Sequence, residues 1–146
     1  MSVVHKAMFA AEVSAKMSNC KKRQVAFVVF NKARILAVGY NMHDEDKPCK
    51  CVAGIHDPYV KHAEPSALNQ DFDRNSNLRG ALTYAPCIKC ARIIVEHNIQ
   101  TVFIKETKHT DGIDYLLKHG VSVQHTWLKP IDYYRQAYDH GVVAHG

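Results

Sequence analysis

Hydrophobic and polar positions along the chain alternate between a helical period and a strand period, with no repeats or low-complexity segments. The run 4–17 has the helical period, and its apolar face would be formed by Val4, Met8, Ala11 and Ala15. This pattern predicts an amphipathic helix. Two apolar runs follow, at 24–30 and 34–40, and the short connection between them predicts an antiparallel hairpin.

The second half of the chain alternates short apolar runs with amphipathic ones. We expect helices at 62–68, 87–98 and 111–119, and strands at 81–85, 101–105 and 121–125. Pro130 fits the first turn of a terminal helix within the segment 130–146. The polar stretch 41–61 is predicted to be a long loop, and a long loop in a compact domain usually has a function.

The order of these elements predicts the fold class. A helix and a hairpin come first, and alternating helices and strands follow, which is typical of an α/β protein. We therefore expect a three-layer α/β/α domain with a mixed, five-stranded sheet. The 146 residues, of which 47% are hydrophobic, suffice for one domain, 1–146, that buries a core without disulfide bonds.

The formal net charge of +5 suits a phosphorylated substrate and nucleic acid equally. The longest basic run, 21–23, has no aromatic residues interleaved as a nucleic-acid surface would need, so a solvated turn is the preferred interpretation. Apolar runs such as 25–30 are too short to cross a bilayer, and Lys6, Glu12 and Lys16 interrupt the first segment where a signal peptide would be apolar. We expect a cytoplasmic protein with no membrane partner.

Two short motifs carry the candidate chemistry: His62-Ala63-Glu64, and Cys87 with Cys90 directly after Pro86. One imidazole and two thiolates make a three-ligand zinc site, which leaves the fourth tetrahedral position open for a water molecule. Glu64, two residues after the histidine, would act as the proton carrier for that water. Both motifs fall at expected helix N-termini, whose partial positive charge favours thiolate over thiol.

A C-x-x-C pair by itself does not specify a catalytic metal site. It can be half of a structural zinc site, a redox pair or two buried cysteines. Here the upstream His-x-Glu, the proline before Cys87 and the helix starts at both motifs favour a catalytic zinc site.

The combination of H-x-E with P-C-x-x-C resembles the signature of zinc-dependent nucleobase deaminases. From the first helix to about His125, the chain resembles the cytidine and deoxycytidylate deaminase superfamily. Within it, the chain is most similar to deoxycytidylate (dCMP) deaminases, particularly the short ones encoded by phages. The segments that carry this resemblance are 18–20, 39–41, 62–64, 83–90 and 110–114.

The resemblance implies hydrolytic deamination of dCMP to dUMP with release of ammonia, a step that feeds thymidylate synthesis. His62, Cys87 and Cys90 would bind the catalytic zinc, and Glu64 would pass a proton from water to the ring and the departing amine. A homo-oligomer, commonly a hexamer, is also implied, and a phage-encoded protein would act in the host cytoplasm.

The resemblance also assigns contacts to the nucleotide. Asn41 would contact the sugar, although asparagine is also common in turns for local reasons. Backbone groups of Ala63 and Ala85 would read the edge of the pyrimidine. Because only main-chain atoms are used at these two positions, their side chains would be free to vary.

The three cysteines outside the motif are Cys20, Cys49 and Cys51. With one histidine, they would complete a closed structural zinc site that orders the long loop, as some members of the family have. The resemblance favours His56 as the fourth ligand, with His43 as the alternative. Three unconnected thiols are the other interpretation.

Several residues depart from the family pattern. Many dCMP deaminases have an arginine in the first helix that meets the 5′-phosphate, whereas this chain has Met17. Lys108 would supply the missing charge, or is an ordinary exposed lysine. Pro65 and Ser66 alter the residues after the H-A-E motif, and the loop 42–46 lacks the pattern associated with regulation by dCTP and dTTP.

Alternative functions remain open from the sequence. The enzyme would act on another cytosine nucleotide or nucleoside, or on a base in RNA or single-stranded DNA. The second of these is less favoured because no basic and aromatic surface track is evident. From another functional class, the chain would be a catalytically silent, zinc-stabilised nucleotide-binding protein. The intact Glu64 argues against that class.

Overall fold

The computed structural model describes residues 2–20, 23–43 and 61–126. Its elements in chain order are α1 (Val3–Ala15), β1 (Ala26–Phe30), β2 (Ile35–Tyr40), α2 (Ala63–Leu68), β3 (Arg79–Tyr84), α3 (Ile88–Glu96), β4 (Thr101–Glu106), α4 (Asp111–Lys118) and β5 (Ser122–His125). Each expected helix and strand within these ranges is confirmed, with ends that differ by at most two residues. The terminal helix expected from Pro130 and most of the loop 41–61 lie outside the described residues.

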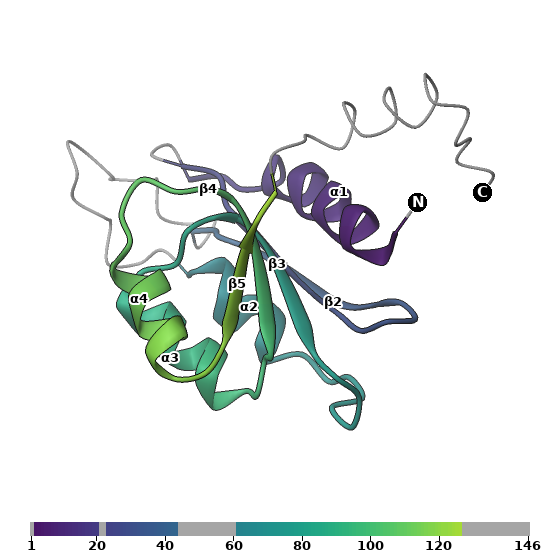
Figure 1. Ribbon diagram of the computed structural model, residues 1–146. Helices are drawn as coiled ribbons and strands as arrows, with labels where there is room; N and C mark the ends of the chain where they lie inside the picture. The colour runs from purple at the N-terminus through teal and green to yellow at the C-terminus, as the bar shows by residue number, and fades with distance from the viewer. Residues whose placement is uncertain (1, 21–22, 44–60, 127–146) are drawn as a thin grey trace, which may run out of the picture.

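The five strands form one mixed sheet with the order β2-β1-β3-β4-β5, which confirms the expected fold class (Figure 1). β1 pairs antiparallel with both β2 and β3, so the predicted hairpin is also confirmed. β3, β4 and β5 run parallel to one another. Since Ala26 pairs with Tyr40, and Tyr84 with Glu106, the start of β1 and the ends of β2, β3 and β4 meet at one edge of the sheet.

Helices cover the two faces of the sheet unequally within the described chain. All of β1 is buried, as expected of a central strand flanked by helical layers. Phe27 and Val29 belong to the core shared with α2, α3 and α4, whereas Val28 and Phe30 belong to the core shared with α1. The alternation of these side chains along one strand therefore separates two hydrophobic cores.

α1 ends earlier than the sequence pattern predicted. The N–H of Met17 donates to the carbonyl of Ser14 at 2.9 Å, and that of Ser18 to the carbonyl of Ala15 at 3.1 Å. These shorter-range bonds tighten and end the helix. Met17 therefore lies in a turn beyond α1, with 67% of its surface exposed.

Candidate active site

Three potential metal ligands meet where two helices begin. His62 is the N-cap residue of α2, and Cys87 is the N-cap residue of α3, with Cys90 one turn further on. Their ligand atoms lie within 4.8 Å of one another, and His62 Nδ1 is 3.2 Å from Cys90 Sγ. Across residues 2–20, 23–43 and 61–126, this is the one such cluster of three or more ligand-type side chains. The structure thus brings together all three predicted ligands of the catalytic zinc.

The donor set suits zinc. Two sulfur atoms and one imidazole nitrogen are ligands that zinc prefers, and three protein ligands leave one tetrahedral position for water or substrate. Bond lengths of about 2.0–2.3 Å place the ligands of one ion within about 4 Å of each other, which matches the compactness of this cluster. Cys90 is buried and Cys87 is exposed, so the cluster is open on one side.

Two glycines allow the cluster to form. A Cβ atom on Gly39 of β2 would lie 2.4 Å from the backbone nitrogen of Ala67, so α2 rests directly on the backbone of β2. A Cβ atom on Gly112 of α4 would lie 1.9 Å from the carbonyl oxygen of Pro86. The absence of side chains at these positions lets α2, and the turn that carries Cys87, approach their neighbours closely.

Hydrogen bonds within the cluster set the ionisation of its sulfur atoms. Hydrogen bonds from Cys90 and His62 lower the pKa of the Cys87 thiol to about 3. The pKa of Cys90 is raised, first by its hydrogen bond to Cys87 and then by burial. The pKa of His62 is raised, chiefly by its hydrogen bond to Cys87. This hydrogen-bond network therefore favours the thiolate form of Cys87.

Glu64 brings a carboxyl group to the same place. It lies in the first turn of α2, is only 4% exposed, and accepts a hydrogen bond from the thiol of Cys90. Burial raises the pKa of Glu64 to about 7. A carboxyl group that titrates near neutral pH can both take up and release a proton, as the predicted proton carrier must.

The residues expected to contact the base lie beside the cluster. Ala63 and Ala85 are both buried. Ala63 is the first residue of α2, where backbone N–H groups have no acceptor within the helix. The N–H of Ala85 donates to the carbonyl of Glu106 at 2.8 Å, so any contact from Ala85 to a base would use its carbonyl group.

Asn41, the expected sugar contact, holds the chain before β1 in place. Its Nδ2 donates to the carbonyl of Arg23 at 2.7 Å, and its Oδ1 accepts from the N–H of Val25 at 2.9 Å. The side chain is 6% exposed. Asn41 therefore has a structural role at the edge of the sheet, whatever contact it makes with a sugar.

The second predicted metal site is only partly described. Cys49, Cys51 and His56 lie outside the described residues. Cys20 and His43 are both buried. The side chain of Asn19 bonds the backbone of His43, with Oδ1 accepting from its N–H at 2.8 Å, which brings the chain next to Cys20 close to the start of the loop.

Sequence analysis missed one cluster at this edge of the sheet. The guanidinium carbon of Arg23 lies 3.7 Å from the centroid of the Tyr84 ring, and the ring of His109 meets Tyr84 edge-on with centroids 6.0 Å apart. Arg23 is half-buried, so it does not fit the solvated turn expected for 21–23. Lys108, the expected phosphate contact, is exposed beside His109. No periodic signal links these residues, because they come from three separate segments.

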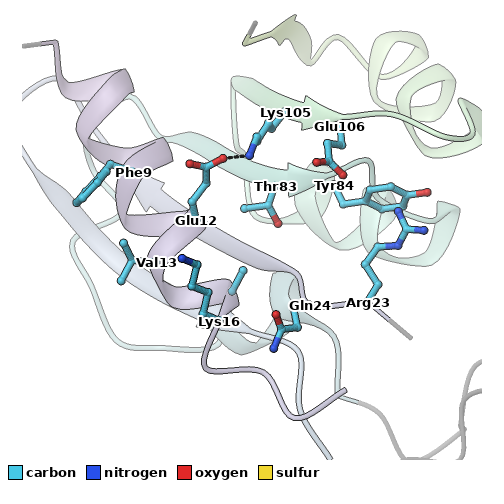
Figure 2. A pocket seen from close by; sticks show the side chains of 11 residues that line it. Phe9, Glu12, Val13, Lys16, Arg23, Gln24, Thr83, Tyr84, Lys105 and Glu106 are labelled. Atoms are coloured by element: carbon cyan, nitrogen blue, oxygen red, sulfur yellow. Dashed lines mark ion pairs between the residues drawn. The ribbon is translucent and has the colours of Figure 1, made fainter. Parts of the chain in front are cut away.

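Two cavities border the site. One, of about 360 Å³, is lined by Met42, Lys61, His62, Pro65, Ser66, Asn69, Lys89, Cys90 and Ile93. The other, of about 480 Å³, lies between α1 and the sheet and is lined by Phe9, Glu12, Val13, Ala15, Lys16, Arg23, Gln24, Thr83, Tyr84, Lys105 and Glu106 (Figure 2). We call the second one the α1 cavity. No helix in the described part of the chain is long and apolar enough to cross a membrane.

Residues 1–106 match the family model described as the cytidine and deoxycytidylate deaminase zinc-binding region. Human deoxycytidylate deaminase is 31% identical over 119 residues, which cover 72% of this chain and 65% of the human protein. ComE operon protein 2 of Bacillus subtilis is 29% identical over 132 residues, 83% of this chain and 69% of that protein. The chain thus spans about two thirds of the length of these relatives.

Solved structures show the same similarity. The dCMP deaminase of the cyanophage S-TIM5, in apo form, is 29% identical, with a TM-score of 0.72 over 85% of this chain and 97% of that one. The same enzyme in complex with dCMP and dUMP has a TM-score of 0.73 over 82% of this chain and 93% of that one. The region matched by the family model includes all three ligands of the cluster and Glu64.

Proposed function

Because the chain belongs to the cytidine and deoxycytidylate deaminase family, we propose that it is a zinc-dependent deoxycytidylate deaminase, which converts dCMP and water to dUMP and ammonia. The observation that carries this proposal is the contact of a buried carboxyl group, Glu64, with a three-ligand cluster of His62, Cys87 and Cys90. The relatives named as deoxycytidylate deaminases, and the phage enzyme in complex with dCMP and dUMP, support the choice of substrate.

The residues of the chain divide the chemistry among them. A zinc ion held by His62, Cys87 and Cys90 would act as a Lewis acid that makes water nucleophilic near neutral pH. Glu64 takes one proton from the attacking water and delivers it to the ring nitrogen N3, where it stays in the product, and then carries the second proton, from the C4 hydroxyl, to the departing amine. The C4–N bond breaks, ammonia leaves, and the C4 oxygen of dUMP comes from water. Burial of Glu64 raises its pKa to about 7, which lets the carboxyl group exchange protons near neutral pH.

We propose that Ala63, Ala85 and Asn41 form the wall against which the nucleoside lies. All three are buried, Ala63 directly follows His62 in the first turn of α2, and Ala85 precedes Cys87 by two residues. Lys108 is proposed as one cation near the phosphate, since it is exposed on the connection after β4.

The test of the main proposal measures ammonia release and bound zinc on the same purified sample. dCMP, deoxycytidine, dCTP, CMP and a tRNA anticodon stem are offered in parallel. Preferred turnover of dCMP by the zinc-loaded protein is expected. Turnover of the anticodon stem alone would identify a nucleic-acid deaminase, and turnover of none would favour the nucleotide-binding alternative.

We also propose a second, structural zinc held by Cys20, Cys49, Cys51 and one histidine, His56 or His43. The burial of Cys20 and His43, and the bonds from Asn19 to the backbone of His43, support this site. Two zinc ions per chain are expected, and Cys20→Ser should leave one. A count of one in the unaltered protein would contradict the second site without affecting the first.

A homo-oligomer is proposed as well, by analogy with the family. Phe9, Val13 and Met17 are 41%, 52% and 67% exposed and follow one another at four-residue spacing along α1 and the turn after it. Exposed apolar side chains at this spacing are suited to contact with another subunit. Light scattering gives the mass directly, and a monomer at micromolar concentration would contradict the proposal.

A further inference from the structure

The proposed substrate carries a phosphate dianion, which needs a cationic partner. Several cations of the described chain line the two cavities beside the sheet. Lys105 is paired with Glu12 across the α1 cavity (Figure 2). Lys61 and Lys89 line the smaller cavity, together with His62 and Cys90. Lys105 is therefore already neutralised, and Lys61 and Lys89 line a different cavity from the one that Arg23 lines.

Arg23 differs from these lysines because both its backbone and its side chain are held in place. Its backbone carbonyl accepts the 2.7 Å hydrogen bond from Asn41, and its guanidinium group lies against the Tyr84 ring at 3.7 Å. Figure 2 shows this stack at one end of the α1 cavity, with the Glu12–Lys105 pair towards the other end. A guanidinium group that stacks by its flat face keeps the N–H groups on its edge available, and those groups match the oxygens of a phosphate.

Chain neighbours and hydrogen bonds link this stack to the proposed reaction site. Tyr84 precedes Ala85 in the chain, and Cys87 follows two residues later. Asn41, which holds the backbone of Arg23, is the proposed sugar contact. The base, sugar and phosphate of one nucleotide would therefore meet Ala85, Asn41 and Arg23 in order. Lys16 adds a second cation to the α1 cavity, and Glu106, the carboxylate on its other side, is exposed to solvent.

We infer that Arg23, held flat against Tyr84, binds the 5′-phosphate of the nucleotide and gives the enzyme its preference for dCMP over deoxycytidine. This inference rests on the proposed function and adds the residue that recognises the phosphate. Tyr84 is a positioning residue, because it acts through the guanidinium group that it supports.

The test compares kcat/KM for dCMP and for deoxycytidine on the same zinc-loaded samples. The ratio of the two values cancels any loss of folded enzyme. Arg23→Gln is expected to lower this ratio about ten- to a hundredfold, since a hydrogen bond to a charged group contributes on that scale. Arg23→Lys should lower it less, and Tyr84→Leu less again, through a rise in KM for dCMP with little change in kcat.

Arg34→Gln is the matched control, because Arg34 is an exposed arginine next to β2 at the opposite edge of the sheet. An unchanged ratio in both arginine variants would overturn the inference and leave the deaminase assignment intact. If Lys108→Gln alone lowers the ratio, Lys108 and not Arg23 holds the phosphate. A wild-type enzyme that shows no preference for dCMP also overturns the inference, and one that deaminates neither compound removes the proposed function with it.

Discussion

On the face of the sheet covered by α2, α3 and α4, the reactive side chains come from two short motifs, whereas the side chains that line the α1 cavity come from four separate segments. His62 and Glu64 share the first turn of α2, and Cys87 and Cys90 share that of α3. Arg23, in contrast, meets its partner Tyr84 from 61 positions away, the difference between 84 and 23.

This difference separates two ways of building a site. A helix start repeats the same local geometry wherever it occurs, so the spacing of ligands within one turn fixes their relative positions. The α1 cavity depends on strand order and register, which are set by contacts between distant parts of the chain. Substitutions on the face covered by α2, α3 and α4, which we call the metal face, should therefore mainly change the rate of the reaction. Substitutions on the face covered by α1 should change the choice of substrate or the stability of the fold.

Removal of zinc should have the largest effect. Chelation followed by dialysis is expected to abolish ammonia release, and added zinc at neutral pH should restore it. Acid should release metal and activity together, since the ligands bind zinc only when deprotonated. Metal content and turnover, measured on the same samples across pH, test this. Full activity in a sample shown to lack metal would contradict the mechanism.

Glu64→Gln should remove turnover while the metal face stays assembled. Loss of a positioned acid–base group is expected to lower kcat by about 10²- to 10⁴-fold. Zinc content and binding of dUMP should be retained, because the amide has the shape of the carboxyl group it replaces. Glu96→Gln, at the exposed end of α3, is the matched control and should leave kcat unchanged. Equal kcat values in both variants would favour a role for Glu64 outside the chemistry.

The glycine contacts test whether helix placement carries the metal site. Gly39→Ala and Gly112→Ala each force a Cβ against neighbouring backbone. Overpacking of this kind is expected to lower the free energy of unfolding by about 1–3 kcal/mol, and the displaced helix starts should weaken zinc binding. Thermal unfolding and zinc competition by a chelator measure the two effects.

Gly120→Ala is the comparison for these variants. Gly120 has a φ of +81° and nothing within 4 Å of an added Cβ. Its substitution should lower stability by about 1–2 kcal/mol through the backbone alone, with unchanged zinc affinity. Equal zinc affinities in all three glycine variants would show that the close contacts do not control the cluster.

A loss of stability as small as that of Gly120→Ala is expected on the α1 face. The buried hydroxyl of Thr83 accepts the N–H of Ala26 at 3.1 Å, between β3 and β1. Thr83→Val should leave that N–H unsatisfied and lower the free energy of unfolding by about 1–2 kcal/mol. Thr83→Ser keeps the hydroxyl and should cost less. Chemical denaturation of the zinc-loaded protein measures the difference, and equal losses would show that the hydroxyl is unimportant.

Much of the fold followed from hydrophobic periods. β1 is a continuous apolar run because it is buried on both faces, and α1 shows its buried face at Met8, Ala11 and Ala15. Helix and strand ends were less exact: β3 begins at Arg79, two residues before the expected strand, because its first residues pair with β1 and β4. Pairing with neighbours, not local propensity, sets where that strand begins.

The sequence by itself identified the proposed metal ligands and the proposed proton carrier. The spacing of His62 and Glu64, and of Cys87 and Cys90, is local, and each pair fits within one turn at a helix start. Local spacing survives any arrangement of the rest of the chain, so these residues can be identified before the fold is known.

Only the tertiary structure decided what surrounds that chemistry. The close approach of Gly112 to Pro86, the bonds from Asn41 to the chain before β1, and the stack of Arg23 on Tyr84 all join segments that are distant in sequence. Strand order and register bring these partners together. Neither can be predicted from only one of the two segments that meet. Short local motifs therefore predict the reaction type, whereas the positions of the side chains that would select the nucleotide depend on the folded sheet.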